Sequence, residues 1–128
     1  MHIGEAAAES GVTAKMIRHY ESIGLIGAAH RTDGGYRSYE TEDVNVLRFV
    51  KRGRTLGFSI EKIRALLALW RDRDRSSGEV KQVALAHVAE LEAKIAELQG
   101  MRDSLQHLVR HCRGDSRPTC PILDDLAG

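Results

Sequence analysis

Short amphipathic stretches separated by glycine dominate the beginning of the chain. Apolar residues on one face of residues 3–10 predict a short helix, which Gly11 would end as a left-handed cap. Thr13 is a suitable N-cap for a second helix over residues 14–21. The positions expected to face inward on this second helix are Met16, Ile17 and Tyr20. Two short helices joined by a tight turn that contains glycine predict a helix-turn-helix.

The next segment has the pattern of a β-hairpin. Residues 31–39 form two short extended pieces around a Gly-Gly turn, as expected for a wing beside the second helix. The long cationic and phenolic side chains of such a wing can contact phosphates beside a DNA groove. The side chains in question are Arg31, Tyr36 and Arg37.

The polar face of the second helix carries the residues expected to meet DNA. Lys15 and Arg18 are three residues apart and therefore share a face, and His19 is also free to project. Taken alone, this face is equally compatible with a solvated surface of an ordinary helical hairpin.

Two further amphipathic helices should follow, the first capped by Thr41 and the second by Ser59. Their inward positions are Val44, Leu47 and Val50, and then Ile60, Ile63, Leu66 and Leu67. A polar edge between them could reach a neighbouring stretch of DNA backbone, although a solvated charge run is the commoner explanation. That edge consists of Arg48, Lys51, Arg52 and Arg54.

A heptad pattern begins after Ser76. Its apolar positions fall at alternating steps of four and three residues, as in a two-helix coiled coil. They are Ala84, Val88, Leu91, Ile95, Leu98, Arg102, Leu105, Val109 and Cys112, with Arg102 the one polar exception. Residues 80–112 would span roughly 50 Å as a helix, which a monomer of this size cannot cover. The pattern therefore predicts a homodimer.

Composition narrows the class of protein. The 128 residues are only 5% aromatic and carry a formal net charge of +1, so the charge alone identifies no partner. The first residues do not resemble a signal peptide, and no run approaches the roughly 18 apolar residues of a membrane span. We therefore expect a cytoplasmic protein, in which thiols stay reduced.

The two cysteines of the chain, Cys112 and Cys120, lie just beyond the heptads. Pro121 suits the first position of a short helix, with Cys120 as its cap. A thiol redox switch is one reading of the pair, and a zinc site that recruits His107 and His111 is another. Two thiolates alone suit a soft ion that accepts two-coordination, such as Cu(I), with Ag(I) or Au(I) as mimics.

These patterns together predict a mainly α protein. A winged helix-turn-helix domain with connecting helices should occupy residues 1–75, and a coiled-coil dimerisation helix residues 76–111. A metal-binding loop and a short terminal helix should occupy residues 112–128. Because no nucleophile–base or carboxylate pair stands at a catalytic spacing, an enzyme is not expected.

The N-terminal motifs resemble the DNA-binding domain of MerR-family transcriptional regulators. The matching residues are Ile3-Gly4-Glu5-Ala6-Ala7, Gly11-Val12-Thr13, Ile17-Arg18-His19-Tyr20-Glu21, Gly24-Leu25-Ile26, Arg31, Gly35-Tyr36-Arg37, Tyr39 and Leu56-Gly57-Phe58-Ser59-Ile60. One departure is Gly27-Ala28-Ala29-His30, where many relatives carry prolines. The resemblance implies that Lys15 and Arg18 enter the major groove of double-stranded promoter DNA. It also implies that the DNA backbone is held by Tyr20, Arg31, Tyr36, Arg37 and Arg54.

The loop from Cys112 to Ile122 resembles the metal-binding loop of the copper-efflux branch of this family. In the divalent-ion branches the position of Ser77 is occupied by a third cysteine, which comes from the partner subunit. The resemblance therefore implies that Ser77 lies beside the metal of the partner subunit without binding it. The resemblance further implies an antiparallel homodimer that distorts the promoter and thereby lets RNA polymerase activate copper-efflux genes. The alternatives are a sensor of a divalent metal such as Zn(II) and, in a different class, a copper-storage or copper-transfer protein.

Overall fold

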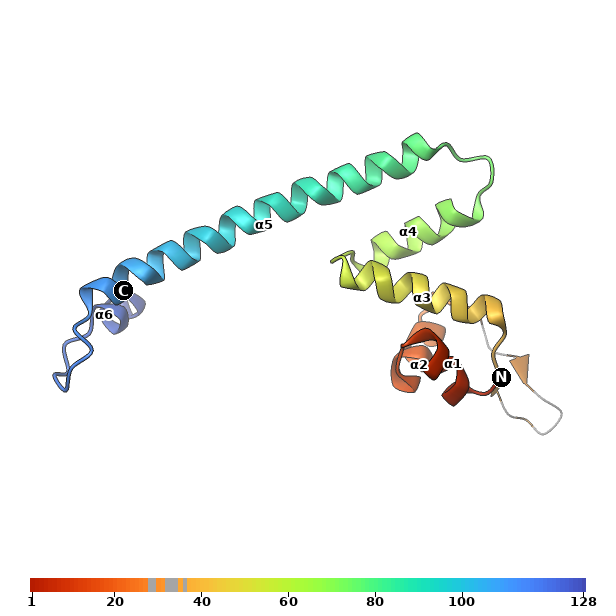
Figure 1. The fold of residues 1–128 in the computed structure, drawn as a ribbon, viewed down its shortest axis with the longest axis horizontal. Coiled ribbons are helices and arrows are strands. Elements are labelled where there is room, and N and C mark those ends of the chain that lie inside the picture. Colours follow the sequence, from red (N-terminus) through yellow and green to blue (C-terminus); the bar gives the residue numbers. More distant parts are fainter. Residues whose placement is uncertain (28–29, 32–34, 36) are drawn as a thin grey trace. The chain divides into compact units, whose positions relative to one another are not determined.

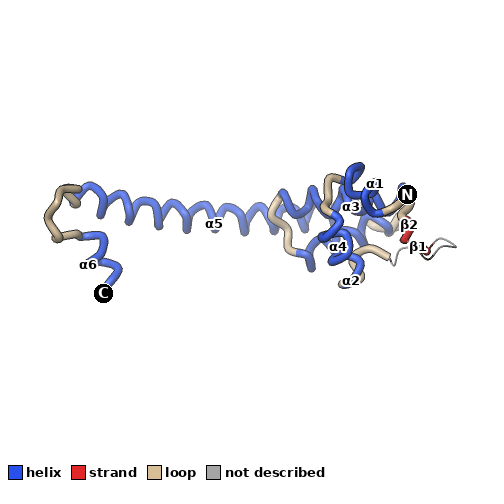
Figure 2. The backbone as a smooth tube through the Cα atoms, turned by 90° about the horizontal axis from the view of Figure 1, so that it is seen from below, coloured by secondary structure: helices blue, strands red, loops and turns tan. Residues whose placement is uncertain are grey.

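The computed structural model describes residues 1–27, 30–31, 35 and 37–128 (Figure 1). In this part of the chain helices predominate and two short strands form one sheet, which confirms the expected mainly α fold (Figure 2). The chain divides into two compact units, Met1–Val80 and Lys81–Gly128. In order, the elements are α1 (Ile3–Ser10), α2 (Ala14–Ser22), β1 (His30–Arg31), β2 (Arg37–Ser38), α3 (Thr41–Thr55), α4 (Ile60–Arg71), α5 (Ser77–His111) and α6 (Pro121–Ala127).

Helices α1 and α2 form the predicted helix-turn-helix, and local capping fixes their ends. The Nδ1 atom of His2 accepts a hydrogen bond of 3.1 Å from the Gly4 N–H at the start of α1. Gly11 ends α1 at φ +73°, a left-handed conformation that favours glycine. Thr13 caps α2 as predicted, because its hydroxyl accepts a hydrogen bond of 3.2 Å from the Met16 N–H.

The core of the first unit lies between α1, α2, α3 and α4. Its predicted inward residues are buried, except that Ile60 and Leu66 are only half-buried and Met16 is 37% exposed. Met16 therefore does not belong to the core. Ile17 and Tyr20 already occupy the inward side of α2, which leaves Met16 at its edge. The fully buried members include Ile17, Tyr39, Val44, Leu47, Val50, Ile63 and Leu67.

Helices α3 and α4 approach each other at Gly53. A Cβ atom at this position would lie 2.9 Å from Cγ1 and 3.1 Å from Cδ1 of Ile63. Because Ile63 is completely buried, it has little room to move away. The absence of a side chain at Gly53 thus permits the close packing of these two helices.

The cap of α3 differs from the prediction. Glu40, and not Thr41, is the N-cap, and the Glu40 N–H donates a hydrogen bond of 2.8 Å to the Asp43 carboxylate. Thr41 is instead the first helical residue. An acidic side chain three residues into the helix can satisfy the N-cap amide, which shifts the helix start by one residue. Ser59 caps α4 as predicted.

The hairpin is represented by two short antiparallel strands. In β1 and β2, His30 pairs with Ser38 and Arg31 with Arg37. Tyr39, directly after β2, is 1% exposed, and its hydroxyl lies 3.1 Å from the Glu21 carboxylate on α2. The Tyr39 N–H also donates to the carbonyl of Met1 at 2.7 Å. These bonds fix the base of the hairpin to the helix-turn-helix.

The second unit contains most of α5, the loop of residues 112–120 and α6. None of the residues of α5 is buried, and apolar side chains at the predicted heptad positions are exposed to solvent, with Val88 47% and Leu98 62% exposed. α6 follows the loop and lies beside the last turns of α5 (Figures 1 and 2). No helix in the described ranges is both long and apolar enough to cross a membrane.

Candidate DNA interface and metal-binding loop

The outward face of α2 carries exposed hydrogen-bond donors. Lys15, Arg18 and His19 are exposed, whereas Ile17 and Tyr20 on the opposite side are buried. Lys15 and Arg18 make no hydrogen bond or ion pair with any other residue that the structure describes. A helix with such a face can present ammonium and guanidinium groups to base edges in a major groove.

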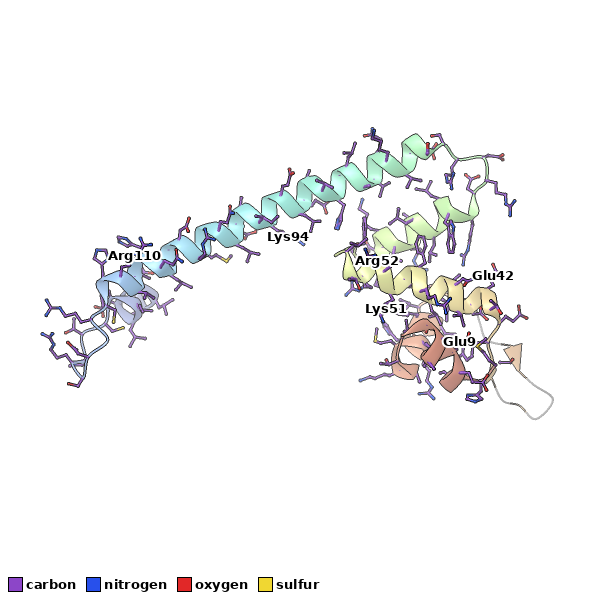
Figure 3. All side chains as sticks on the ribbon, in the orientation of Figure 1. Glu9, Glu42, Lys51, Arg52, Lys94 and Arg110 are labelled. Atoms are coloured by element: carbon purple, nitrogen blue, oxygen red, sulfur yellow. The ribbon has the colours of Figure 1, made fainter. Side chains whose placement is uncertain are left out.

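A cationic hollow lies beside the turn between α1 and α2. It has a volume of about 240 Å³, and its lining includes Tyr20, Lys51 and Arg54. Figure 3 shows Lys51 on the side of α3 toward α1 and α2, and its Nζ atom lies over the turn, 2.5 Å from where a Cβ of Gly11 would stand. Lys51 belongs to the polar edge that the sequence offered as a possible contact with the DNA backbone, although a solvated charge run was the commoner explanation for that edge. Its three-residue spacing from Arg54 was the available signal.

Two of the predicted phosphate contacts are constrained by their surroundings. Tyr20 is only 5% exposed, so its ring is mainly part of the core and meets the outside at the cationic hollow. Arg54 donates a hydrogen bond of 3.2 Å from Nη1 to the carbonyl of Phe58. Arg48 is used structurally, because its guanidinium donates two hydrogen bonds of 3.0 and 2.8 Å to the carbonyl of Glu9.

Two predicted site residues face each other as backbone partners across the hairpin. Arg31 in β1 is the direct partner of Arg37 in β2. Tyr36, the third residue predicted in the wing, lies outside the described residues. Gly35 adopts φ +82°, as a glycine at the tip of a hairpin can.

The cysteines flank the loop between α5 and α6. The Cys112 N–H donates a hydrogen bond of 3.2 Å to the Val109 carbonyl, which continues the last turn of α5. Cys120 is the N-cap of α6 and Pro121 is its first residue, as predicted. Both thiols are free and half-buried. Gly114 lies between them at φ +65°, which lets the chain turn back.

An ion pair that the sequence analysis missed organises the loop. Asp115 accepts hydrogen bonds of 2.9 and 2.7 Å from the Arg117 guanidinium, and its other oxygen accepts one of 2.9 Å from the Arg117 N–H. The side-chain bond to Arg117, followed by the backbone bond, lowers the pKa of Asp115. An Asp followed two residues later by a basic residue is a signal for this turn, but a weak one.

The donor set of the loop is small. Within the described ranges no group of three or more His, Cys, Asp and Glu residues is arranged to hold a metal ion. His111 lines a hollow of about 280 Å³ together with residues of the loop, including Arg113 and Arg117. Two thiols with basic residues nearby suit a soft ion of low coordination number whose complex carries negative charge.

Ser77 is the first residue of α5, and the Ser76 hydroxyl beside it accepts a hydrogen bond of 3.2 Å from the Glu79 N–H. The helix therefore starts at a local serine cap. The expected approach of Ser77 to the cysteines of a partner subunit remains a prediction.

Comparison with known proteins places the chain in a family. Residues 1–70 match the model of the MerR HTH family regulatory proteins, and residues 44–108 match the model described as MerR, DNA binding. The chain is 60% identical over 127 residues to heavy metal-dependent transcription regulator 2 of Rhizobium meliloti, with 99% of the chain and 86% of that protein covered.

Two further relatives extend the comparison. The HTH-type transcriptional regulator CueR of Salmonella typhimurium is 41% identical over 128 residues, covering 100% of the chain and 93% of that protein. The crystal structure of the transcription regulator PbrR691 from Ralstonia metallidurans CH34 in complex with lead(II) has a TM-score of 0.84 and 32% identity, with 98% of each chain covered. These relatives are transcription regulators, in agreement with the expectation that the chain is not an enzyme. From the two family models and the extent of these matches, the chain belongs to the MerR family of helix-turn-helix transcription regulators.

Proposed function

We propose that this protein is a Cu(I)-responsive regulator that binds the metal through Cys112 and Cys120. The observation that carries the proposal is the pair of free, half-buried thiols at the two ends of one short loop. The loop offers two soft sulfur ligands and, within the described residues, no third ligand grouped with them. Cu(I) accepts two thiolates, and Ag(I) or Au(I) would mimic it.

Charge also favours a monovalent ion. A monovalent cation with two thiolates carries a net charge of −1, whereas a divalent cation would leave the complex neutral. The loop contains Arg113 and Arg117, and Arg117 is already paired with Asp115. A residual negative charge at the metal is therefore compatible with the basic side chains of the loop.

The regulatory action is proposed to operate on promoter DNA. Lys15, Arg18 and His19 would face the major groove, while the wing and the cationic hollow would hold phosphates. Metal binding would stabilise one shape of the bound DNA over another, so that RNA polymerase can transcribe copper-efflux genes. The similarity to CueR and to the heavy metal-dependent regulators supports a metal as the signal.

A homodimer is the proposed form of the protein. Apolar heptad side chains of α5 are exposed to solvent in the single chain, with Ile95 53%, Leu105 50% and Val109 58% exposed. A continuous apolar stripe along a helix needs a partner, and a second copy supplies an identical stripe. In an antiparallel pair each metal loop would lie near Ser77 of the partner subunit, which would stay outside the metal's ligand set.

A divalent-metal sensor is the second candidate. The observation in its favour is the similarity to a regulator whose structure contains lead(II). A dication would need more donors than the two thiolates of one chain, so its ligands would have to include another residue or water.

Anaerobic titration of the full chain with Cu(I) and Zn(II) tests the proposal. We expect one Cu(I) per chain with two sulfur ligands by X-ray absorption. Cys112→Ser and Cys120→Ser should each abolish copper-dependent transcription from the target promoter while leaving DNA binding nearly intact. Ser116→Ala, which changes an exposed residue of the same loop, is the matched control and should respond normally. Full activation by copper in either cysteine variant would contradict the two-thiolate site.

A gel shift separates a regulator from a copper-storage or copper-transfer protein. A regulator should bind a palindromic promoter fragment in preference to unrelated DNA, with an affinity that falls as salt rises. A copper carrier should show no such preference.

A further inference from the structure

Two histidines lie on one face at the end of α5. His107 and His111 are four residues apart and both are exposed, and their ring centroids are separated by 4.3 Å. Side chains at this spacing on a helix are neighbours. Two histidines four residues apart on one helix face are also a recurrent way of binding a zinc ion.

A backbone hydrogen bond fixes the ring of His111. Its Nδ1 atom lies 2.8 Å from the carbonyl oxygen of His107. A carbonyl can only accept, so Nδ1 carries the hydrogen, and in the neutral ring Nε2 then carries the lone pair. This is the arrangement found in metal-bound histidines, whose second nitrogen donates to a carbonyl or a carboxylate and thereby orients the ring.

The pair lies away from the predicted dimer seam. His107 is two residues beyond the seam position Leu105, and His111 is two residues beyond Val109. Two residues correspond to a rotation of about 200° around a helix, so both rings lie on the outer side of a coiled coil. Dimerisation through the heptads would therefore leave the histidines accessible.

Carboxylates lie beside one of the two histidines. A hollow of about 450 Å³ is lined by His107 and, among others, by the carboxylates of Asp103 on α5 and Asp125 on α6. His111 lines a different hollow, together with Arg113 and Arg117. Arg102 already pairs with Asp103 at 3.0 Å, and neither carboxylate completes a three-ligand group with the histidines in the described part of the chain. The acidic groups beside His107 would favour a cation through their charge, and water would fill the remaining coordination positions.

We propose that His107 and His111 form a divalent-metal site that is separate from the cysteine loop and takes Zn(II). Neutral imidazole nitrogens suit borderline divalent ions such as Zn(II), whereas the thiolates suit soft monovalent ions. The bound ion would join two successive turns of α5 immediately before Cys112. Because the two rings already lie side by side in the folded helix, the ion would bind the helical state and stabilise the end of α5.

The test uses the full-length protein carrying Cys112→Ser and Cys120→Ser, so that no thiolate can bind the probe. Zinc chloride is added under calorimetry, and the histidine ring signals are followed by NMR. We expect about one Zn(II) per chain, with shifts confined to the rings of His107 and His111. Adding His107→Gln should weaken binding at least about tenfold, since losing even an outer partner of a metal ligand typically costs 10–100-fold.

His87→Gln is the matched control, because His87 lies on the same helix but has Glu90 as its neighbour, 3.8 Å away. It should leave zinc binding unchanged. The inference is overturned if the double-serine protein binds no zinc, because the ion would then depend on the thiolates. It is also overturned if His107→Gln binds zinc as tightly as its parent. Either outcome leaves the copper proposal untouched, since both measurements are made without the cysteines.

Discussion

Gly53 offers a quantitative test of the packing between α3 and α4. Replacing it by alanine adds a methyl group whose carbon would lie 2.9 Å from Cγ1 of the fully buried Ile63. Overpacking of this kind costs about 1–3 kcal/mol. Alanine also has a higher helix propensity than glycine, and this gain of about 0.8–1.0 kcal/mol offsets part of the overpacking cost. The free energy of unfolding should therefore fall by about 0–2 kcal/mol.

Gly100 is the matched control for this substitution. It lies inside α5 and is exposed, and apart from its chain neighbours and the backbone of its own helix no atom lies within 4 Å of an added Cβ. Gly100→Ala should therefore gain up to about 1 kcal/mol from propensity alone. The two substitutions are chemically identical, so opposite signs would isolate the contact with Ile63.

Urea unfolding of the full-length variants at one protein concentration measures both effects, because a dimer's stability depends on concentration. Circular dichroism at 222 nm follows the helices in both. Trp70, the only tryptophan, stacks on Phe49 of α3 with ring centroids 4.7 Å apart and therefore reports on α4 by fluorescence. If Gly53→Ala stabilises the protein as much as Gly100→Ala does, the close approach of α3 and α4 at this point is refuted.

Three further predictions concern the sites. Arg18→Ala should cost about 1–3 kcal/mol of binding free energy at the specific promoter, whereas Arg37→Ala should weaken binding to all DNA sequences alike and reduce the slope of log affinity against log salt concentration by about 1. Equal, sequence-independent losses of both variants in binding titrations would contradict the assignment of α2 as the recognition helix. Arg117→Ala should raise the pKa of Asp115 toward its ordinary value, as measured by carboxyl NMR. In the parent protein the pair's contribution to loop order is present above the ordinary aspartate pKa and is lost as pH falls through the lowered pKa of Asp115. An unchanged pKa in the variant would show that the pair does not form. Ser77→Cys should add a response to Hg(II) or another dication in a reporter assay, because a divalent ion with three thiolates has the same net charge of −1 as a monovalent ion with two. An unaltered response would place Ser77 away from the metal.

The elements governed by local signals could be predicted from the sequence. The helix over residues 3–10 ends where expected because Gly11 is a left-handed cap, and the next helix begins where expected because Thr13 caps it; both signals act within a few residues. The start of α3 was placed one residue late, since Glu40 and Thr41 are both plausible caps and Asp43 decides between them. Met16 was assigned to the core because helical periodicity does not distinguish the centre of a buried face from its edge.

Features that join distant residues could not be predicted in the same way. The position of the Lys51 ammonium over Gly11 and the contact of Gly53 with Ile63 depend on how helices pack, which no local pattern specifies. The cysteines were identified as a pair because they are the only two and flank a turn. The Asp115–Arg117 pair between them is local but consists of ordinary surface residues, and its spacing is too weak a signal to distinguish it from solvated charges.

The end of α5 also suggests how one short region could discriminate among metals without an elaborate cavity. The thiols of Cys112 and Cys120 and the imidazoles of His107 and His111 are close in sequence but differ in softness and in charge when they bind. Two thiolates bring a charge of −2 and favour a soft monovalent ion, while two neutral imidazoles bring none and favour a hydrated dication. The two proposed sites would therefore select different ions chiefly through the chemistry of their donor atoms. Only the ion held by the thiolates would bridge α5 and α6 across the loop, so only that ion could change the order of the loop. A zinc ion on the histidines would instead stabilise a helix that is already formed.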